Sequence, residues 1–390
     1  MRHPTRGGSG RTPTPIVIPA EKPLAGFVAS EYVRPNSECL IEIRGIHTFD
    51  EGLTFYNVLD GLNSYLQKAA CPPSQVDRML LIVLRDKTFM YLNDNLPLTW
   101  DVRVKRQLNA GERVFRNDIA GIRQVNFPGI EVPEQSGFLL LLSAGWRRGV
   151  CFDLQALEPG TAVNSQEVFA GFKQMAGLLL THLWFTGKFL LESTDWDEVI
   201  EAGWFPFIFL ADDLWEGLFK AVKYDGDLQA EEQRVYEAFL ESCEERLSNW
   251  NLNRHFADHM DFLKSAVEAY KRNEWLTVVS LVAPRIEGLL RKAFGVWGTH
   301  RELVTTFVGT LERQEHEKSL LFPQRLQQYF EKVFFRYTDF RTTDLPATRH
   351  TVAHGMVSPK NLTRKEATTV LLLIDHILYC LPSEPEEDKA

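Results

Sequence analysis

The sequence predicts an α+β protein in which a small α/β domain precedes a mainly α-helical domain. Two patterns support this division. Up to about residue 155, apolar residues occur in short runs of strand length, separated by turn-forming residues. From Ser165 onward they recur every three or four residues over long stretches, as on the buried face of amphipathic helices.

The composition indicates a folded intracellular protein. Of the 390 residues, 44% are hydrophobic and 12% aromatic, which provides enough apolar material for two cores. The five cysteines are dispersed and include no C-x-x-C pair, as is typical of reduced thiols rather than of a disulfide framework or a zinc cage. No apolar run approaches the roughly 18 residues that a membrane span requires. We therefore expect a cytoplasmic protein that makes no membrane contact.

Five segments follow from the changes in composition along the chain. The first residues lack the apolar centre of a signal peptide, and the last residues are acidic. The expected segments are a flexible tail (1–28), an α/β recognition or sensor domain (29–160), a helical connecting region (161–250), a helical bundle (251–382) and an acidic tail (383–390).

In the first domain, apolar runs bounded by turn residues predict strands. Leucines at helical spacing predict a helix over Glu51–Ala69, which Pro72 and Pro73 end. The segment Val102–Phe127 shows no clear period. The expected strands are Cys39–Ile43, Arg78–Leu84, Phe89–Leu92, Gly137–Ser143 and Val150–Leu154, with the last two joined as a hairpin through Gly145–Gly149.

Beyond Pro159 the apolar spacing predicts helices with recognisable starts. Asn164 or Ser165 is a suitable N-cap, and Thr363 with Glu366 has the spacing of a capping box. Pro323 lies in the first turn of its helix, where its missing N–H costs little. The expected helices span residues 165–190, 209–221, 228–249, 254–272, 275–294, 301–314, 319–336, 346–356 and 363–381.

The first domain also carries a basic region with an aromatic tip. Two interpretations remain open: a solvated loop face, or a sensor surface that delivers a nucleic acid or a partner to the helical domain. Its residues are Arg103, Lys105, Arg106, Arg113, Arg116, Arg123 and the turn Trp146–Arg148.

One cluster of chemically active residues stands out in the helical part. The sequence contains no P-loop, no G-x-G-x-x-G after a strand and no H-E-x-x-H. Near the start of a short helix, however, an arginine and two histidines occur within six residues, in a chain with ten histidines. The cluster consists of Arg349, His350 and His354, and Gly355 follows it.

These residue types suit phosphoryl chemistry on RNA. A neutral imidazole with a pKa of about 6.5 can take a proton from a 2′-hydroxyl, and a guanidinium can stabilise charge on phosphate oxygens. RNA supplies its own nucleophile, so no metal-bound water is required. In an ideal helix Arg349 and His354 lie about 140° apart, so either the arginine curls round or two copies of the chain complete the site. His350 and His354 share a face.

Local charge agrees with a phosphate-binding role. The net charge of -9 makes the whole chain repel nucleic acid, so any polyanion must bind a local patch. Between Arg336 and Lys365, six basic residues accompany two acidic ones. This excess favours phosphate contacts, for which the candidates besides the motif are Arg341, Lys360, Arg364 and Lys365.

Here the sequence resembles the HEPN superfamily. An arginine, a polar residue beside it, and a histidine four to six positions after the arginine form the signature of that superfamily, often with a glycine next. Arg349, His350, His354 and Gly355 match it.

The resemblance extends upstream of the motif and covers roughly residues 254–381. The stretch Asn273–Phe294, which contains Glu287, is similar to the helix that precedes the motif in HEPN proteins of defence and toxin type. The segment 251–382 is therefore expected to be a HEPN-like helical bundle.

The resemblance implies a dimer that brings two Arg/His motifs together and cleaves RNA without a metal or a cofactor, giving a 2′,3′-cyclic phosphate. It also implies toxin or antiviral defence systems, with an antitoxin or regulatory protein as a further partner. Arg349 would bind and stabilise the phosphate, and His354 would be the general base or acid. His350 would assist, and Glu287 is a further supporting candidate.

Other interpretations stay open. The domain could be a non-catalytic HEPN scaffold that dimerises and binds RNA or a nucleotide. Arg349 could form a structural pair with a carboxylate. Asp375 and His376 could orient a site residue, but their place in an otherwise apolar helix favours a hydrogen-bonded core pair.

Overall fold

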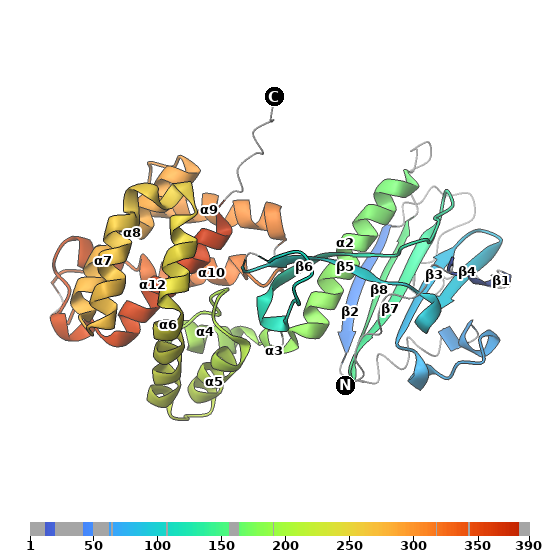
Figure 1. The fold of residues 1–390 in the computed structure, drawn as a ribbon, viewed down its shortest axis with the longest axis horizontal. Helices are drawn as coiled ribbons and strands as arrows, with labels where there is room; N and C mark the ends of the chain where they lie inside the picture. Colours follow the sequence, from blue (N-terminus) through green and yellow to red (C-terminus); the bar gives the residue numbers. More distant parts are fainter. Residues whose placement is uncertain are drawn as a thin grey trace. The chain divides into compact units, whose positions relative to one another are not determined.

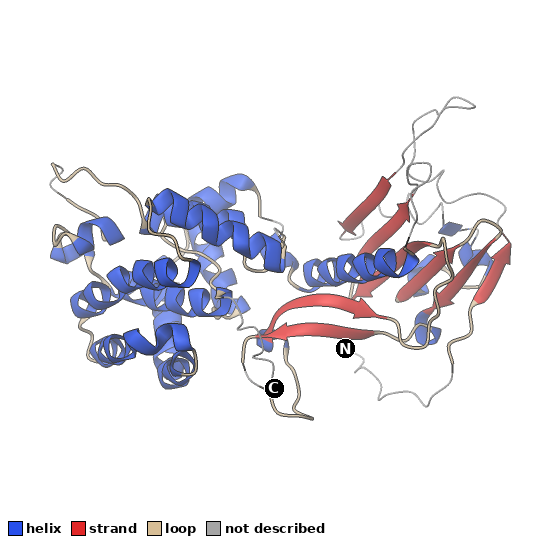
Figure 2. Cartoon of the chain, turned by 90° about the horizontal axis from the view of Figure 1, so that it is seen from above, coloured by secondary structure: helices blue, strands red, loops and turns tan. Residues whose placement is uncertain are grey.

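The computed structural model describes residues 12–19, 42–49, 62–63, 65–106, 108–155, 164–189, 191–316, 318–341 and 344–381. The chain divides into two compact units (Figure 1). The sheet unit consists of Met1–Val104 and Gly121–Phe189, and the helical unit of Lys105–Ala120 and Leu190–Ala390. An antiparallel sheet in one unit and packed helices in the other make the α+β class an observed property (Figure 2).

The larger sheet has six strands in the order β1-β4-β3-β7-β8-β2, and every neighbouring pair is antiparallel. Strands β5 and β6 form a separate two-stranded sheet. The strands are β1 (Ile16–Pro19), β2 (Glu42–Phe49), β3 (Arg78–Val83), β4 (Lys87–Leu92), β5 (Thr99–Val104), β6 (Ile119–Asn126), β7 (Gly137–Ala144) and β8 (Arg147–Gln155).

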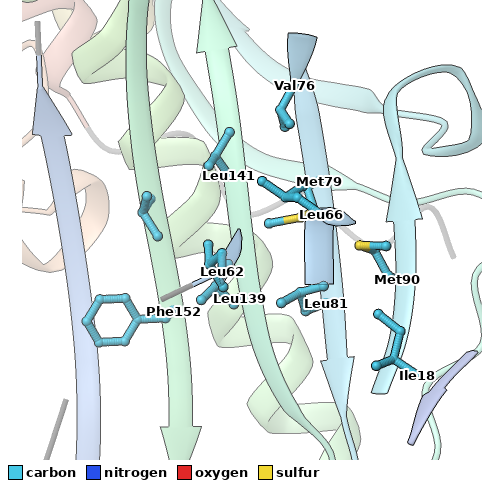
Figure 3. Packing of buried hydrophobic residues seen from close by; sticks show 11 residues of the cluster. Ile18, Leu62, Leu66, Val76, Met79, Leu81, Met90, Leu139, Leu141 and Phe152 are labelled. Atoms are coloured by element: carbon cyan, nitrogen blue, oxygen red, sulfur yellow. The ribbon is translucent and has the colours of Figure 1, made fainter. Parts of the chain in front are cut away.

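Both faces of the sheet are buried at its central strands β3 and β7, which explains why these two strands are apolar over continuous runs rather than alternating. Met79 and Leu81 of β3 point into a cluster on one face (Figure 3), where Leu62 and Leu66 cover them. On the other face Phe138 packs against Phe169 of α2 (Ser165–Trp184), with ring centroids 4.9 Å apart.

The close fit of α2 requires two glycines. A Cβ on Gly149 of β8 would lie 2.5 Å from the Leu179 side chain. A Cβ on Gly177 would lie 2.8 Å from the backbone of Arg123 and Gln124 in β6. Because α2 is attached in this way, the helix belongs to the sheet unit and not to the helical connecting region expected over 161–250.

Two further expectations for the first half need correction. The expected flexible tail (1–28) contains β1, since the β-branched run from Ile16 to Ile18 pairs with β4 as an edge strand that Pro19 ends. The segment Val102–Phe127, which shows no period, contains β6 and part of β5. Glu51–Gly61 and the acidic tail (383–390) lie outside the described residues.

The helical unit follows the expected pattern closely, with one helix, α4, that the apolar spacing did not predict. Expected residues 319–336 form a shorter α-helix from Pro323, continued by the π-helical turn η6. The elements after α2 are α3 (Thr186–Phe189), α4 (Ser193–Glu201), α5 (Asp212–Lys223), α6 (Leu228–Asn251), η5 (Arg254–His259), α7 (Met260–Lys271), α8 (Trp275–Phe294), α9 (His300–Glu315), α10 (Pro323–Tyr329), η6 (Phe330–Phe334), α11 (Arg349–Ala353) and α12 (Arg364–Cys380).

Helix α12 is the central element of this unit. All its residues from Ala367 to Ile377 are buried, and it packs against α6 and α8. Its start is the expected capping box of Thr363 with Glu366, just as Asn164 caps α2. The amphipathic helix α8 packs against α11, the short helix that begins at Arg349.

Candidate functional site

The short helix α11 is defined by local signals at both ends. Thr348 caps its start and forms a capping box with Thr351. At its other end, the Gly355 N–H donates to the Val352 carbonyl and the Met356 N–H to the Thr351 carbonyl, which is a Schellman motif. Gly355 supplies the required left-handed backbone, with φ +65°. His354 is therefore the last residue before the chain turns away, and it is exposed.

The buried carboxylate of Glu287 on α8 fixes this helix. Glu287 is 5% exposed and forms an ion pair with Arg349. Its Oε1 also accepts a hydrogen bond from Arg291 Nε at 2.7 Å and lies 3.1 Å from His300 Nε2. One buried acid thus holds three groups that carry or can carry positive charge, as expected for a buried carboxylate, which is stable only when it is paired.

Arg291 links this cluster to the next loop. Its Nη1 donates to the Val296 and Gly298 carbonyls, each at 3.0 Å, and so ties the end of α8 to the chain that enters α9. His300, the first residue of α9, stacks on Phe335 with ring centroids 5.0 Å apart. Three separate segments are held around Glu287 in this way.

The imidazoles of the motif lie beside exposed aromatic rings. His350 and His354 have ring centroids 4.9 Å apart. The Phe340 ring is nearly parallel to His350, with centroids 4.6 Å apart and a 5° interplanar angle, and it meets His354 edge-on at 5.5 Å. Tyr337 lies 5.4 Å from His350.

The charged groups near His350 change its pKa. Burial lowers the pKa of His350, and the charges of His354, Arg349 and His300 lower it further. Because its pKa is lowered, His350 is mainly neutral at neutral pH. Arg349 directly precedes it in α11 and turns toward Glu287 of α8.

The side chains of Arg349, His350 and His354 form few hydrogen bonds or ion pairs with the described residues. Glu287 is the only charged or hydrogen-bonding partner of the Arg349 side chain among the described residues, and the contact uses Nε. The ring nitrogens of His350 and His354 have no hydrogen-bonding partner in that part of the chain. Arg349, His350 and His354 can therefore receive a ligand without first breaking a bond to each other.

The structure separates the four candidates for additional phosphate contacts. Arg341 pairs with Asp339 next to Phe340 on an exposed turn, and Lys360 lies 3.0 Å from Asp344. Arg364 and Lys365 are in the first turn of α12.

These two residues of α12 contact a different part of the bundle. Arg364 bonds Gln233, and Lys365 lies 3.8 Å from Glu232 on α6. They line a shallow depression of about 380 Å³ with Trp275, the first residue of α8. Glu287 is twelve residues further along this helix, about 18 Å away along its axis. Arg364 and Lys365 are thus not part of the Arg349 cluster.

Other candidates from the sequence have structural partners. Asp375 pairs with Arg246 and accepts a hydrogen bond from Trp250 at 2.6 Å, and His376 is fully buried. In the basic region, Arg106 pairs with Glu112 and Asp118.

The turn at the tip of the basic region is also used internally. Arg148 donates to the backbone of Pro73 and Ser74. Arg116 lies 3.1 Å from Asp212. These contacts favour the structural interpretation for the residues that make them.

Sequence reasoning missed His300, Tyr337 and Phe340. Tyr337 and Phe340 lie in the basic segment between Arg336 and Lys365, close to the motif in sequence. This closeness could have identified them as candidates. Nothing in the sequence connects His300 to Glu287, because they meet only when α8 and α9 pack together.

No family model, curated protein or solved structure matches this chain. Among the helices that the structure describes, none has the length and apolarity that a bilayer crossing requires. In the same described ranges, no group of three or more His, Cys, Asp or Glu is arranged to hold a metal ion.

Proposed function

We propose that the helical unit is a HEPN-type endoribonuclease that cleaves single-stranded or loop RNA without a metal and acts as a homodimer. One observation carries the proposal. The guanidinium of Arg349 is anchored through Nε to the buried Glu287 and directly precedes His350, whose ring lies 4.9 Å from that of His354; neither imidazole has a hydrogen-bonding partner among the described residues. This combination provides a phosphate-binding cation beside a proton acceptor.

In the proposed reaction, His354 takes the proton of the 2′-hydroxyl, and the 2′-oxygen attacks the adjacent phosphorus. The bond from phosphorus to the 5′-oxygen breaks, and this oxygen takes a proton from water. The products are a 2′,3′-cyclic phosphate and a 5′-hydroxyl. The lowered pKa of His350 keeps that ring neutral, so it does not provide the proton.

Arg349 stabilises the charge that grows on the phosphate oxygens as the 2′-oxygen attacks. Its anchor gives it a fixed direction, because Glu287 is itself held by Arg291. The conformational entropy of this long side chain is then lost during folding and not during the reaction.

The test is cleavage of a mixed RNA pool by wild type, His354→Ala and Arg349→Ala, with EDTA present. We expect wild type to leave 2′,3′-cyclic phosphate ends and each variant to lose cleavage by about 10²–10⁴-fold while remaining folded. Equal cleavage by wild type and the Arg349 variant would expose a contaminating ribonuclease. Loss of the wild-type activity in EDTA would contradict the mechanism.

Dimerisation is tested separately by sedimentation of the purified full chain. A wild type that cleaves RNA only at concentrations where it is dimeric supports a site completed by two copies. A monomer with full activity excludes that part of the proposal.

A second candidate is a non-catalytic scaffold that dimerises and binds RNA or a nucleotide. The ion pair between Arg349 and Glu287 favours it, because a neutralised arginine also serves as a structural contact between α11 and α8. RNA binding by wild type with no cleavage, in the assay above, would select the scaffold.

A role as a toxin or in antiviral defence, kept silent by an antitoxin or regulatory protein, is part of the same proposal. Overexpression in a bacterial host is then expected to arrest growth with the intact motif and not with His354→Ala. Equal growth arrest by both would contradict this role.

A further inference from the structure

Two exposed aromatic side chains adjoin the motif. Tyr337 is 80% exposed and Phe340 37%. Exposed single aromatics are common, but these two contact the same imidazole, that of His350. We call Tyr337 and Phe340 the aromatic ledge.

The ledge is continuous with the reactive groups. Phe340 lies flat on His350 and edge-on to His354, so a ring placed against the ledge lies beside the imidazole that is proposed to take the proton. Arg349 directly precedes His350 in α11. A flat apolar surface and a cation therefore occur side by side.

We infer that the aromatic ledge binds one unstacked nucleobase of a single-stranded RNA, next to the phosphate that Arg349 holds. The inference rests on the proposed function and names how its substrate is recognised. A nucleotide joins a flat ring to an anion through a ribose, and the site offers a partner for each. Bases stack on exposed aromatic side chains only when they are unpaired, as in single strands and loops.

Charge complementarity favours this occupant over an apolar surface of a second copy. A second copy that covered Tyr337 with apolar side chains would leave the two imidazoles, and the guanidinium nitrogens of Arg349 that Glu287 does not bind, without a hydrogen-bonding partner. A nucleotide satisfies the ring and the cation together. The Tyr337 hydroxyl has no hydrogen-bonding partner among the described residues, and the side chain is largely exposed although its ring adjoins His350, so most of it is open to a ligand.

The probe for this inference is a short 2′-O-methyl RNA strand with 2-aminopurine at each position in turn. The methyl group replaces the proton that the reaction removes, so the strand binds without being cut. Stacking on an aromatic ring quenches 2-aminopurine fluorescence. Wild type is expected to quench the probe at one or a few positions.

Three variants sharpen the measurement. Tyr337→Ala is expected to bind about tenfold more weakly and to lose the quench, because a stacked base contributes about 1–3 kcal/mol. Tyr337→Phe keeps the ring and should bind like wild type. Tyr224→Ala is the matched control, since Tyr224 is 69% exposed at the end of α5 and has no part in the ledge.

Two results would overturn the inference. One is that Tyr337→Ala binds the probe and quenches its fluorescence as strongly as wild type does. The other is loss of the dimer in sedimentation by Tyr337→Ala with the quench unchanged, which would assign the ledge to a contact between copies. If wild type binds the probe without any quench, base stacking on the ledge is rejected and the proposed function is not. If wild type neither binds the probe nor cleaves RNA, the proposed function is rejected as well.

Discussion

Among the described residues of the helical unit, two buried carboxylates pair with arginine, and they differ in what surrounds them. Glu287 is 5% exposed and Asp375 2%. Asp375 is enclosed by Arg246 and Trp250 in the core, and burial raises its pKa. Glu287 instead anchors side chains that reach the surface, among them Arg349 and His300, which are 21% and 39% exposed.

A buried ion pair is therefore not evidence of a site by itself. The surroundings of Glu287 differ because its partner Arg349, and the neighbouring His350 and His354, keep hydrogen-bonding atoms that no described residue uses. The His376 ring beside Asp375 does not reach the surface, because it is fully buried among aromatic residues. Mutations at the two carboxylates should separate stability from activity.

The largest stability effect is expected at the core pair. Arg246→Ala leaves Asp375 buried with only Trp250 as a partner, which should destabilise the helical unit by about 3–5 kcal/mol. Urea unfolding followed by far-ultraviolet circular dichroism measures it. Arg272→Ala is the matched control, because its partner Glu274 is at the surface, and it should unfold close to wild type. Equal stability of the two variants would mean that the core pair contributes little.

The second prediction compares the two acids directly. Glu287→Gln releases Arg349 and should reduce RNA cleavage about 100-fold, because a misplaced group loses most of its effect on the transition state. Asp375→Asn should change stability and leave the cleavage rate of the folded protein unchanged. Both rates are measured at a protein concentration and temperature where each variant is folded. A larger loss of cleavage in Asp375→Asn would reverse the comparison.

The third prediction concerns pH and the ring beside Asp375. The His376 Nδ1 accepts the Ile208 N–H at 3.1 Å, so the folded protein needs the neutral ring. Burial lowers the pKa of His376 to about 3, from 6.5 in the unfolded chain. The unfolded state then binds more protons between these values, and stability falls as pH decreases below about 6.5, by up to about 1.4 kcal/mol per pH unit.

Replacing this ring should flatten the acid side of the stability curve. His376→Phe is expected to gain on wild type as pH falls from neutral to about 5, whereas His354→Phe, at an exposed position, should follow the wild-type curve. Asp375, whose pKa burial raises, acts in the opposite sense, and because it is present in both proteins its contribution cancels when wild type and His376→Phe are compared. Parallel curves for wild type and His376→Phe would contradict the assignment.

Local sequence signals predicted the elements best where burial is uniform or a cap is present. The run Met79–Val83 is apolar throughout because both sheet faces are covered there, and the helix Trp275–Phe294 matches its expected bounds. Short elements with mixed exposure were missed, namely α4 and β5 with β6. In these, packing against the rest of the unit contributes more than propensity.

By itself, the sequence determined the α+β class, most helices and strands, and the motif of Arg349, His350 and His354, because these depend on spacing and on caps a few residues away. Only the tertiary structure decided which carboxylate holds Arg349 and which aromatic rings adjoin His350. It also decided that Arg364 contacts α6, not the motif. Ion pairs and ring contacts between distant segments depend on how helices pack, and side-chain periodicity within one helix does not encode the identity of its neighbour.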